Sequence, residues 1–429
     1  MASIVHALSR IKSELDQIAP AELIHEFCKQ VGHRWRERIL NPATTIQLML
    51  LQLLAKVSLA GLRRVSKVAA SAQAICAARK RLPLEVMIRL VEYAGKALGQ
   101  TCIDTWKGFR VVLADGSSFM TEDTPELAKT YGRARNQRGT SCSYPVPKLL
   151  ALLDLASGLI HKLITLPCDR GERAALSRMF RYLQKGDLML GDRGLASFAH
   201  LALMVAQGLH ACMRVPEWLR VQGHGRTHGR PVKRLGQQDW LVRWMPDRRP
   251  RWMKPAEWKK MPAELTLRQI AFRLCRPGFR TRWAWVVTTL LDPVQYPAQE
   301  IVQLYERRWQ VEVCFRDLKQ SLGFRKLSAK RVAGVRKEVL AFVLLYNLVR
   351  RIMLQAARQQ GVEPERISFI DAVRWLLWSE PGEPLPPLVV NPKRSRPSEP
   401  RMIKGGRRKH PRLKGRRRSL QRPRYVARI

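Results

Sequence analysis

Apolar residues recur at helical spacing over the first hundred positions of the chain. One such stretch holds Leu48, Leu51 and Leu54, and a second, amphipathic stretch runs from Leu84 to Leu98. Few turn-forming residues interrupt these stretches. The pattern predicts an all-helical N-terminal domain over residues 1–105.

The pattern changes at Phe109 to short apolar runs that are bounded by Gly and Asp. The runs FRVVLADGS and KLLALLDLASGLIHKLITL predict strands, and the second run contains a hairpin that turns at residues 156–158. Helices over Glu172–Leu183 and Ser197–Gln207 then alternate with strands at DLMLGD and HACMRV. Strands that alternate with helices after an antiparallel meander indicate an α/β domain with a mixed sheet.

Residues 216–282 interrupt this alternation and are rich in Arg, Pro and Trp. The stretches DWLVRWM and LRQIAFRL predict antiparallel strands, so we expect an inserted β-rich subdomain here. A strand over Trp283–Leu291 and a long helical region over Pro297–Gln360 return to the α/β core. The core domain is therefore predicted to be split in the sequence, into residues 106–215 and 283–378.

The charge of the chain adds a partner to this picture. Lys and Arg number 78 against 34 Asp and Glu, which gives a net charge of +44 and a pI near 11.1. Residues 393–429 hold 16 Lys and Arg and one Glu, so the remaining residues still carry +29. A polyanion is the expected partner of such a chain. We expect residues 379–429 to form a Pro-rich linker and a disordered basic tail.

Several other classes of protein do not fit the sequence. The apolar stretch Ile46–Leu62 is broken by polar residues and is shorter than the roughly 20 residues of a spanning helix, so we expect no membrane segment. The N-terminus lacks the features of a signal peptide, which predicts a cytoplasmic location. The eight cysteines are scattered without a C-x-x-C pair, as in reduced core thiols. His224 and His228 lie in a Gly/Arg-rich run that favours a basic loop over a metal site.

Two acidic residues lie where predicted strands end. Asp115 stands in VVLADGSS and Asp192 in LMLGDRG. Strand ends are where α/β domains bind ligands, and a carboxylate on a rigid strand is placed in advance for a metal ion. Each aspartate alone is also a common turn former.

The segment LYERRWQVEVCFRDLKQSL predicts a helix with a buried face and a polar stripe beside it. At about 100° per residue, the stripe contains Tyr305, Arg308, Glu312 and Lys319. Glu312 is flanked by Arg308, Arg316 and Lys319, as expected where an acidic metal ligand meets anionic phosphates. The alternative is a salt-bridge ladder of Glu312 with Arg308 and Arg316, at about 0.3 to 0.5 kcal/mol per pair. The ladder does not account for Tyr305 and Lys319 in the same register.

The same residues resemble a known family. Tyr305, Arg308, Glu312 and Lys319 reproduce, with two, three and six residues between them, the Tyr-Arg-Glu-Lys signature of bacterial insertion-sequence transposases of the family-four group, which are Asp-Asp-Glu transposases. The resemblance covers about Ile46 to Ala356. It implies a ribonuclease-H-like catalytic fold preceded by a helical DNA-binding domain.

The resemblance also implies the roles of the site residues. Asp115, Asp192 and Glu312 would hold two Mg²⁺ ions, for which Mn²⁺ can substitute, and would support phosphoryl transfer on DNA. Two such ions carry +4 and can keep three neighbouring carboxylates ionised. Tyr305, Arg308 and Lys319 would contact DNA phosphates, with Arg316 beside them.

One aromatic residue is assigned by the same resemblance. Family members that cut through a hairpin intermediate flip a base and stack it on a Trp. Trp285 precedes Thr289 by four residues and Glu312 by 27, which makes it the candidate, with Trp283 as its rival. A core Trp on an alternating strand is the other interpretation.

The sequence thus predicts a DNA transposase that acts on double-stranded DNA, both element ends and target, by a cut-and-paste route. The family implies a homodimer on paired ends and a bacterial, nucleoid-associated location. Two alternatives remain open. A transposase-derived repressor would bind DNA without cutting it, although it has no use for three acids near phosphates. A metal-dependent nuclease would cut strands without joining them.

Overall fold

A nine-stranded sheet forms the centre of the computed structural model, which describes residues 6–100, 105–135, 141–215, 229–246, 248–274, 282–380 and 382–392. Within these residues the strand order is β3-β2-β1-β4-β5-β9-β8-β7-β6. The strands are β1 (Val111–Ser118), β2 (Lys148–Asp154), β3 (Ile160–Leu166), β4 (Leu188–Gly191), β5 (His210–Arg214), β6 (Gly229–Gly236), β7 (Asp239–Trp244), β8 (Leu265–Leu274) and β9 (Arg282–Thr288).

The sheet is mixed, as the sequence predicts. Strands β1, β2 and β3 form an antiparallel meander, whereas β4 pairs in parallel with both β1 and β5. The predicted hairpin turn is confirmed between β2 and β3, where Gly158 adopts a φ of +69°. The alternating helices are confirmed as α8 (Glu172–Met179), which a 3₁₀ turn extends, and α9 (Phe198–Ala206).

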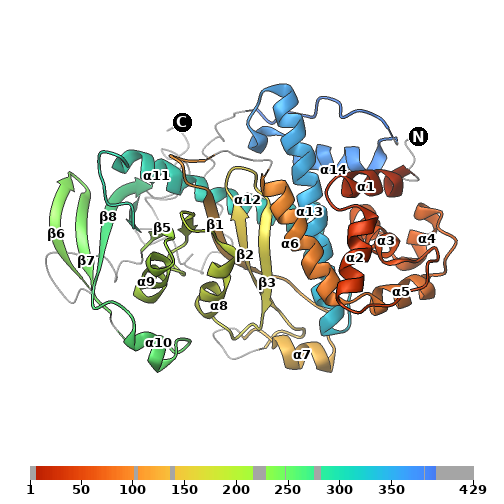
Figure 1. The fold of residues 1–429 in the computed structure, drawn as a ribbon, viewed down its shortest axis with the longest axis horizontal. Coiled ribbons are helices and arrows are strands. Elements are labelled where there is room, and N and C mark those ends of the chain that lie inside the picture. Colours follow the sequence, from red (N-terminus) through yellow and green to blue (C-terminus); the bar gives the residue numbers. More distant parts are fainter. Residues whose placement is uncertain are drawn as a thin grey trace, which may run out of the picture.

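The strands expected for an inserted subdomain extend this same sheet. Strand β9 pairs on one side with β5 and on the other with β8, so β8, β7 and β6 continue the sheet to its far edge. In Figure 1 they lie at the end of the molecule opposite the N-terminal helices. The short helix α10 (Pro255–Lys259) follows β7. The boundaries 216 and 282 of a separate subdomain stay a prediction, and residues 216–228 and 275–281 lie outside the described part.

Helices occupy most of residues 6–100, the described part of the N-terminal region, as predicted. They are α1 (Ala7–Asp16), α2 (Ala21–Gln30), α3 (Pro42–Ala55), α4 (Leu59–Ser66), α5 (Ala72–Arg81) and α6 (Leu84–Gln100). Side chains of Asn41, Ser58 and Ser71 accept hydrogen bonds from the first turns of α3, α4 and α5, which fixes where these helices begin. Helix α6 packs on β3 and on α13 (Val332–Gln360), so the N-terminal helices share one hydrophobic core with the sheet layer.

Helix α13 is the longest helix of the described chain. It is long and apolar enough to cross a membrane by composition, but 83% of its most apolar window is buried inside the protein, and α3, α6, α14 (Phe369–Trp378) and β3 pack on it. Figure 1 shows it running beside α6 and the β2–β3 hairpin. Burial of this kind is typical of a central core helix. The stretch Ile46–Leu62 forms α3 and α4, which meet at a bend of 104°.

The prediction of one long helical region over Pro297–Gln360 is wrong in detail. The chain forms α11 (Ala298–Glu306), a 3₁₀ turn at Arg307–Trp309, α12 (Gln310–Arg316) and a π-helical turn at Asp317–Ser321 before it leaves the helical path. Gly323, with a φ of +91°, ends this run. The backbone of residues 325 and 327 then pairs with Met120, just beyond β1. This pairing with a distant strand end outweighs the local helical pattern.

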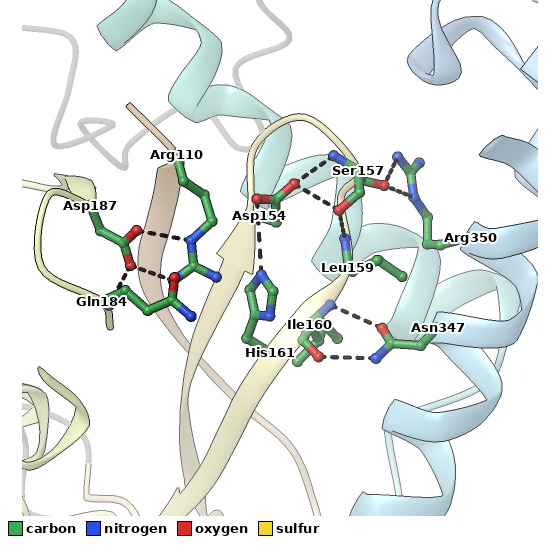
Figure 2. A network of polar contacts seen from close by, with 10 residues as sticks. All are labelled: Arg110, Asp154, Ser157, Leu159, Ile160, His161, Gln184, Asp187, Asn347 and Arg350. Atoms are coloured by element: carbon green, nitrogen blue, oxygen red, sulfur yellow. Dashed lines mark hydrogen bonds and ion pairs between the residues drawn. The ribbon is translucent and has the colours of Figure 1, made fainter. Parts of the chain in front are cut away.

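A buried polar network fixes the β2–β3 hairpin to α13 (Figure 2). The carboxylate of Asp154 accepts from the backbone N–H and the hydroxyl of Ser157, and Arg350 donates to the Ser157 carbonyl from Nε at 2.9 Å and from Nη2 at 2.6 Å. Asn347 exchanges two hydrogen bonds with the backbone of Ile160. These bonds satisfy polar groups that would otherwise be costly to bury, so the position of the hairpin on α13 is well defined.

Candidate active site

Asp115 and Asp192 occupy neighbouring positions at the centre of the sheet. The parallel register pairs Ala114 of β1 with Gly191 of β4, and each aspartate is the next residue along its own strand. Adjacent strands lie about 4.8 Å apart, and residues in register point to the same face. The sheet therefore places these two positions side by side. The predicted strand end is confirmed for Asp192, which follows β4, but is wrong for Asp115, since β1 continues to Ser118 in its pairing with β2.

Glu312 reaches the same place from a helix, and Arg308 joins it to the sheet. Helix α12 packs on β1. The Arg308 guanidinium lies 3.5 Å from Asp115 Oδ2 through Nη1, and 3.4 Å from Glu312 Oε1 through Nη2. Burial lowers the pKa of Arg308, but Tyr305 and the carboxylates of Asp192, Asp115 and Glu312 raise it further. The three acids thus share one cationic neighbour.

The Asp115 carboxyl is held in an unfavourable place for a negative charge. Burial raises its pKa to about 6, and the nearby Asp192 and Glu172 add to that rise. The N–H of Gly116, which donates to Oδ1 at 2.8 Å, and the Arg308 guanidinium act in the opposite direction. A carboxylate in such surroundings is stabilised by any cation that binds beside it.

The two basic residues beyond Glu312 differ in their surroundings. Lys319 donates a hydrogen bond to Ser117 Oγ, and burial together with Arg325 lowers its pKa. Arg316 is exposed and pairs with Asp317. Four of the predicted residues, Asp115, Glu312, Arg316 and Lys319, line one pocket of about 390 Å³, whereas Asp192, Arg308 and Tyr305 are not among its lining residues. The other lining residues are Gly116, Ser117, Phe315, Gln320 and Arg325.

Tyr305 departs from the predicted stripe. Its side chain is only 5% exposed and its hydroxyl has no hydrogen-bond partner among the described residues. Burial raises its pKa well above the usual range. The ring packs against Phe272 of β8, and the Arg308 guanidinium lies 6.0 Å from its centre. Tyr305 is therefore part of the core beside Arg308, whereas the sequence predicted it on a polar stripe next to the buried face.

Trp283 and Trp285 lie on the same face of β9, two residues apart. Trp283 is 42% exposed and carries Arg273 over its ring at 5.1 Å. Trp285 is half-buried and packs against the second hydrophobic core, which includes Val287 of the same strand. Trp283 is thus the more exposed ring and Trp285 the more buried one. The choice of Trp285 as the stacking residue stays a prediction.

Glu172 is a residue of the site that the sequence analysis used only as the start of a helix. Its carboxylate lies against Gly116, next to Asp115, and within electrostatic range of Asp192. Burial and Asp192 raise its pKa, and Lys148 lowers it. An acid in the first turn after a strand is a weak signal, since helix starts favour acids in general.

The acidic groups do not yet form a closed metal site. Among the described residues, no three His, Cys, Asp or Glu side chains are close enough to hold one ion together. The guanidinium of Arg308 stands between Asp115 and Glu312 instead. The donor set still fits a hard divalent cation, because it consists of carboxylate oxygens, which Mg²⁺ and Mn²⁺ prefer.

The matches to known proteins identify the class. Residues 106–348 match the family described as "Transposase DDE domain", and the chain belongs to this family. The chain is similar to "Transposase InsG for insertion sequence element IS4" of Escherichia coli (strain K12), at 25% identity over 303 residues, which are 70% of this chain and 65% of that protein. The match therefore spans slightly less than two thirds of this relative. The resemblance to insertion-sequence transposases is confirmed.

Other similarities are shorter or more distant. "Putative transposase InsZ" of the same strain is 28% identical over 118 residues, which are 28% of this chain and 40% of that protein. A solved piggyBac transposase synaptic complex with hairpin DNA covers 88% of this chain and 80% of its own, with 11% identity and a TM-score of 0.43.

Proposed function

We propose that this chain is a DNA transposase that cleaves and transfers strands at the ends of an insertion sequence, by a cut-and-paste route. The observation that supports the proposal is the position of Arg308, which contacts Asp115 of β1 and Glu312 of α12 and lies within electrostatic range of Asp192 after β4. Family membership supports the same assignment. The antiparallel meander beside parallel strands supports a ribonuclease-H-like catalytic fold.

The three carboxylates would hold two Mg²⁺ ions, or Mn²⁺ in their place. Such a pair of ions activates the attacking oxygen and stabilises the leaving oxygen of a phosphodiester. For the acids to close on a cation, the Arg308 guanidinium has to leave its position between Asp115 and Glu312. A DNA phosphate gives Arg308 a bidentate partner in exchange, so arrival of DNA and assembly of the acidic site favour each other.

The remaining residues would bind and orient the DNA. Lys319 and Arg316 line the pocket beside Glu312 and bring positive charge to the phosphates near the scissile bond. The Tyr305 ring lies beside the Arg308 guanidinium and would help to orient it, so Tyr305 would affect the phosphate contact indirectly, through Arg308. Trp285 is the proposed stacking partner of a flipped base.

The parts outside the core are assigned in the same proposal. Residues 1–105 would form a helical DNA-binding domain, 106–215 with 283–378 the catalytic domain, and 216–282 an inserted β-rich subdomain. Residues 379–429 would form a linker and a basic tail, of which 393–429 lie outside the described residues. We propose a homodimer on paired element ends, and a cytoplasmic, nucleoid-associated protein.

The test uses the full chain and DNA that carries the inverted repeats flanking its gene. Asp115→Asn, Asp192→Asn and Glu312→Gln should each lower strand cleavage about 10³-fold or more, because each removes a metal ligand, and DNA binding should stay within a few fold. Asp169→Asn, an exposed loop acid near α8, is the matched control and should cleave like the parent protein.

Three results would contradict the proposal. A triad variant that cleaves at the parent rate excludes the metal site. If the parent protein binds the ends but does not cut them in Mg²⁺ or in Mn²⁺, the chain is a DNA-binding repressor and not a transposase. Cleaved ends that are never joined to a target identify the nuclease.

A further inference from the structure

We propose that Glu172 is a fourth carboxylate of this site and helps to hold its divalent cation. The proposal rests on the proposed function, since it assigns a further ligand to the same metal centre. The supporting observation is that Gly116, the residue after Asp115, leaves space for the Glu172 carboxylate.

Gly116 forms a cradle that only a residue without a side chain allows. A Cβ built on Gly116 would lie 2.4 Å from Cδ and from Oε1 of Glu172, and 2.7 Å from Oε2. Side-chain carbons do not approach a carboxylate this closely. Glycine therefore lets the Glu172 carboxylate lie directly on β1, one residue from Asp115.

The position of Glu172 is set by a rigid element. It is the first residue of α8, which packs on β2 and β3. Strand β2 is itself in register with β1, where Asp115 pairs with Ala151. Glu172 thus approaches the aspartates from the α8 side, whereas Glu312 approaches from α12.

The Glu172 carboxylate lacks a protein donor. Among the described residues, none donates a hydrogen bond to it or forms an ion pair with it, and Lys148 acts on it only over a longer range while donating to the carbonyl of Arg170 at 3.2 Å. Asp115, Asp192 and Glu172 therefore lie within electrostatic range of one another beside β1 and β4, although without a cation the described side chains do not converge on one point. Mutual repulsion makes it unfavourable for all three carboxylates to be ionised, and a divalent cation offsets this repulsion more effectively than the single charge of Arg308.

An ordinary role for Glu172 predicts a different geometry. A glutamate at the start of a helix interacts with the exposed N–H groups of that helix and gains up to about 1 kcal/mol there. It needs no glycine on a neighbouring strand. The two roles also differ in their effect on stability, because removing a helix-capping charge lowers the melting temperature, whereas removing one of several crowded acids does not.

The experiment measures Mn²⁺ binding to the full chain, by electron paramagnetic resonance of free Mn²⁺, and the melting temperature with EDTA and with Mn²⁺. Glu172→Gln is nearly isosteric and should weaken Mn²⁺ binding by about tenfold or more, within the range for groups that support a metal site. It should leave the melting temperature in EDTA unchanged or raise it. Glu172→Asp should bind Mn²⁺ with intermediate affinity, and Asp169→Asn should match the parent protein.

Gly116→Ala tests the cradle itself. The added methyl group should displace the Glu172 carboxylate and weaken Mn²⁺ binding, and the double variant Gly116→Ala/Glu172→Gln should be no weaker than the more affected single variant. Additive losses would overturn the assignment of the cradle to Glu172.

The outcomes separate this inference from the proposed function. If Asp192→Asn weakens Mn²⁺ binding and Glu172→Gln does not, Glu172 is not part of the metal site and the triad stands. If Glu172→Gln lowers the melting temperature in EDTA and leaves the Mn²⁺-induced rise intact, its role is structural and the inference fails. If neither Asp192→Asn nor Glu172→Gln changes Mn²⁺ binding, both the inference and the proposed metal site are wrong.

Discussion

Lys319 donates a hydrogen bond from Nζ to Oγ of Ser117 at 2.5 Å, although 202 residues separate the two in sequence. The bond ties the π-helical turn after α12 to β1, two residues beyond Asp115. Because Glu312 belongs to α12, the contact helps to set the position of Glu312 relative to Asp115. Lys319 therefore has a positioning role in the protein without DNA, in addition to its proposed phosphate contact.

The proposed phosphate contacts can be separated from this positioning role. Arg308→Ala and Lys319→Ala should each weaken binding to cleaved-end DNA and reduce the salt dependence by about one phosphate. Ser117→Ala is the matched control, since it removes the hydrogen bond and keeps the charge, so the slope should stay at the parent value. Binding measured between low and high salt provides the slopes. Unchanged slopes in both cationic variants would favour a salt-bridge ladder with Glu312.

Arg308→Lys should be poorly tolerated in cleavage. A lysine ammonium is a point charge and cannot bridge Asp115 and Glu312, or bind a phosphate, in the bidentate manner of a guanidinium. Cleavage rates should fall toward those of Arg308→Ala, whereas the salt slope should stay near that of the parent. A variant that cleaves as fast as the parent would show that charge alone is sufficient at this position.

The metal-free protein should lose stability as the pH rises through 6, as far as Asp115 contributes. Burial raises its pKa to about 6, so the folded chain holds this proton more tightly than the unfolded chain, whose carboxyl titrates near 3.8. The stabilising contribution is complete below pH 4 and lost above pH 6. Asp115→Asn should therefore stabilise the protein in EDTA at pH 7.5, by at most about 3 kcal/mol, with no gain at pH 4.

Calorimetry in EDTA across this pH range measures the effect. With added Mn²⁺ at pH 7.5, Asp115→Asn should instead be less stable than the parent protein, because bound Mn²⁺ stabilises the parent and the variant has lost a metal ligand. A gain that is the same at pH 4 and pH 7.5 would contradict the assignment to the Asp115 proton.

Trp285→Ala should separate two steps of the reaction if this residue stacks a flipped base. It would lose about 1 to 3 kcal/mol of stacking, which impairs hairpin formation, while first-strand nicking persists. Trp283→Ala is the matched comparison, two residues away on the same face of β9. If Trp283→Ala gives the separated behaviour instead, the assignment moves to Trp283. A fall in melting temperature for Trp285→Ala would identify a core residue.

Gly158→Ala should destabilise the protein more than Gly361→Ala. Both glycines have positive φ, at +69° and +62°, which costs a non-glycine residue about 1 kcal/mol. A Cβ on Gly158 would also lie 2.5 Å from Nη2 of Arg350, and displacing that buried guanidinium costs a further ~2 kcal/mol in lost hydrogen bonds. No atom of the described residues lies within 4 Å of a Cβ on Gly361. Equal losses in urea unfolding would show that the Arg350 network relaxes freely.

The sequence predicted most strands and most helices well, because alternation and helical spacing are local properties. Strand β6 (Gly229–Gly236) is an exception, since the Gly/Arg-rich run that leads into it was predicted to be a basic loop. The proximity of Asp115 to Asp192 was predicted from parallel strand ends, but β1 continues past Asp115 to Ser118, and the two positions are adjacent because the parallel pairing of β1 with β4 ends at Ala114 and Gly191. Continuation of the sheet from β5 through β9 to β6 could not be predicted, because residues 214 and 286 meet across a long stretch of chain. Local patterns contain no record of such pairing.

The surroundings of the site depend more on tertiary contacts. The helical wheel assumed one uniform helix from Leu304 to Leu322, but the 3₁₀ turn advances by about 120° per residue instead of 100°, which shifts Glu312 relative to Tyr305. Helix α11 also contacts both β5 and β8. Tyr305 is therefore buried on a side of the helix that the sequence pattern predicted to be exposed to solvent. The approach of Glu172 to Gly116 joins residues that are 56 positions apart and left no pattern in the sequence.

Strand β6, one of the two edge strands of the sheet, carries residues that oppose pairing with a second molecule. Among the described residues β6 pairs only with β7, and an unpaired strand edge can pair with a strand of another molecule and so promote aggregation. Its exposed residues include Arg230, Pro231, Lys233 and Arg234. Proline withholds a donor, and like charges repel a second copy of the same edge. Part of the positive charge of this chain thus opposes edge-to-edge pairing of β6 between two molecules.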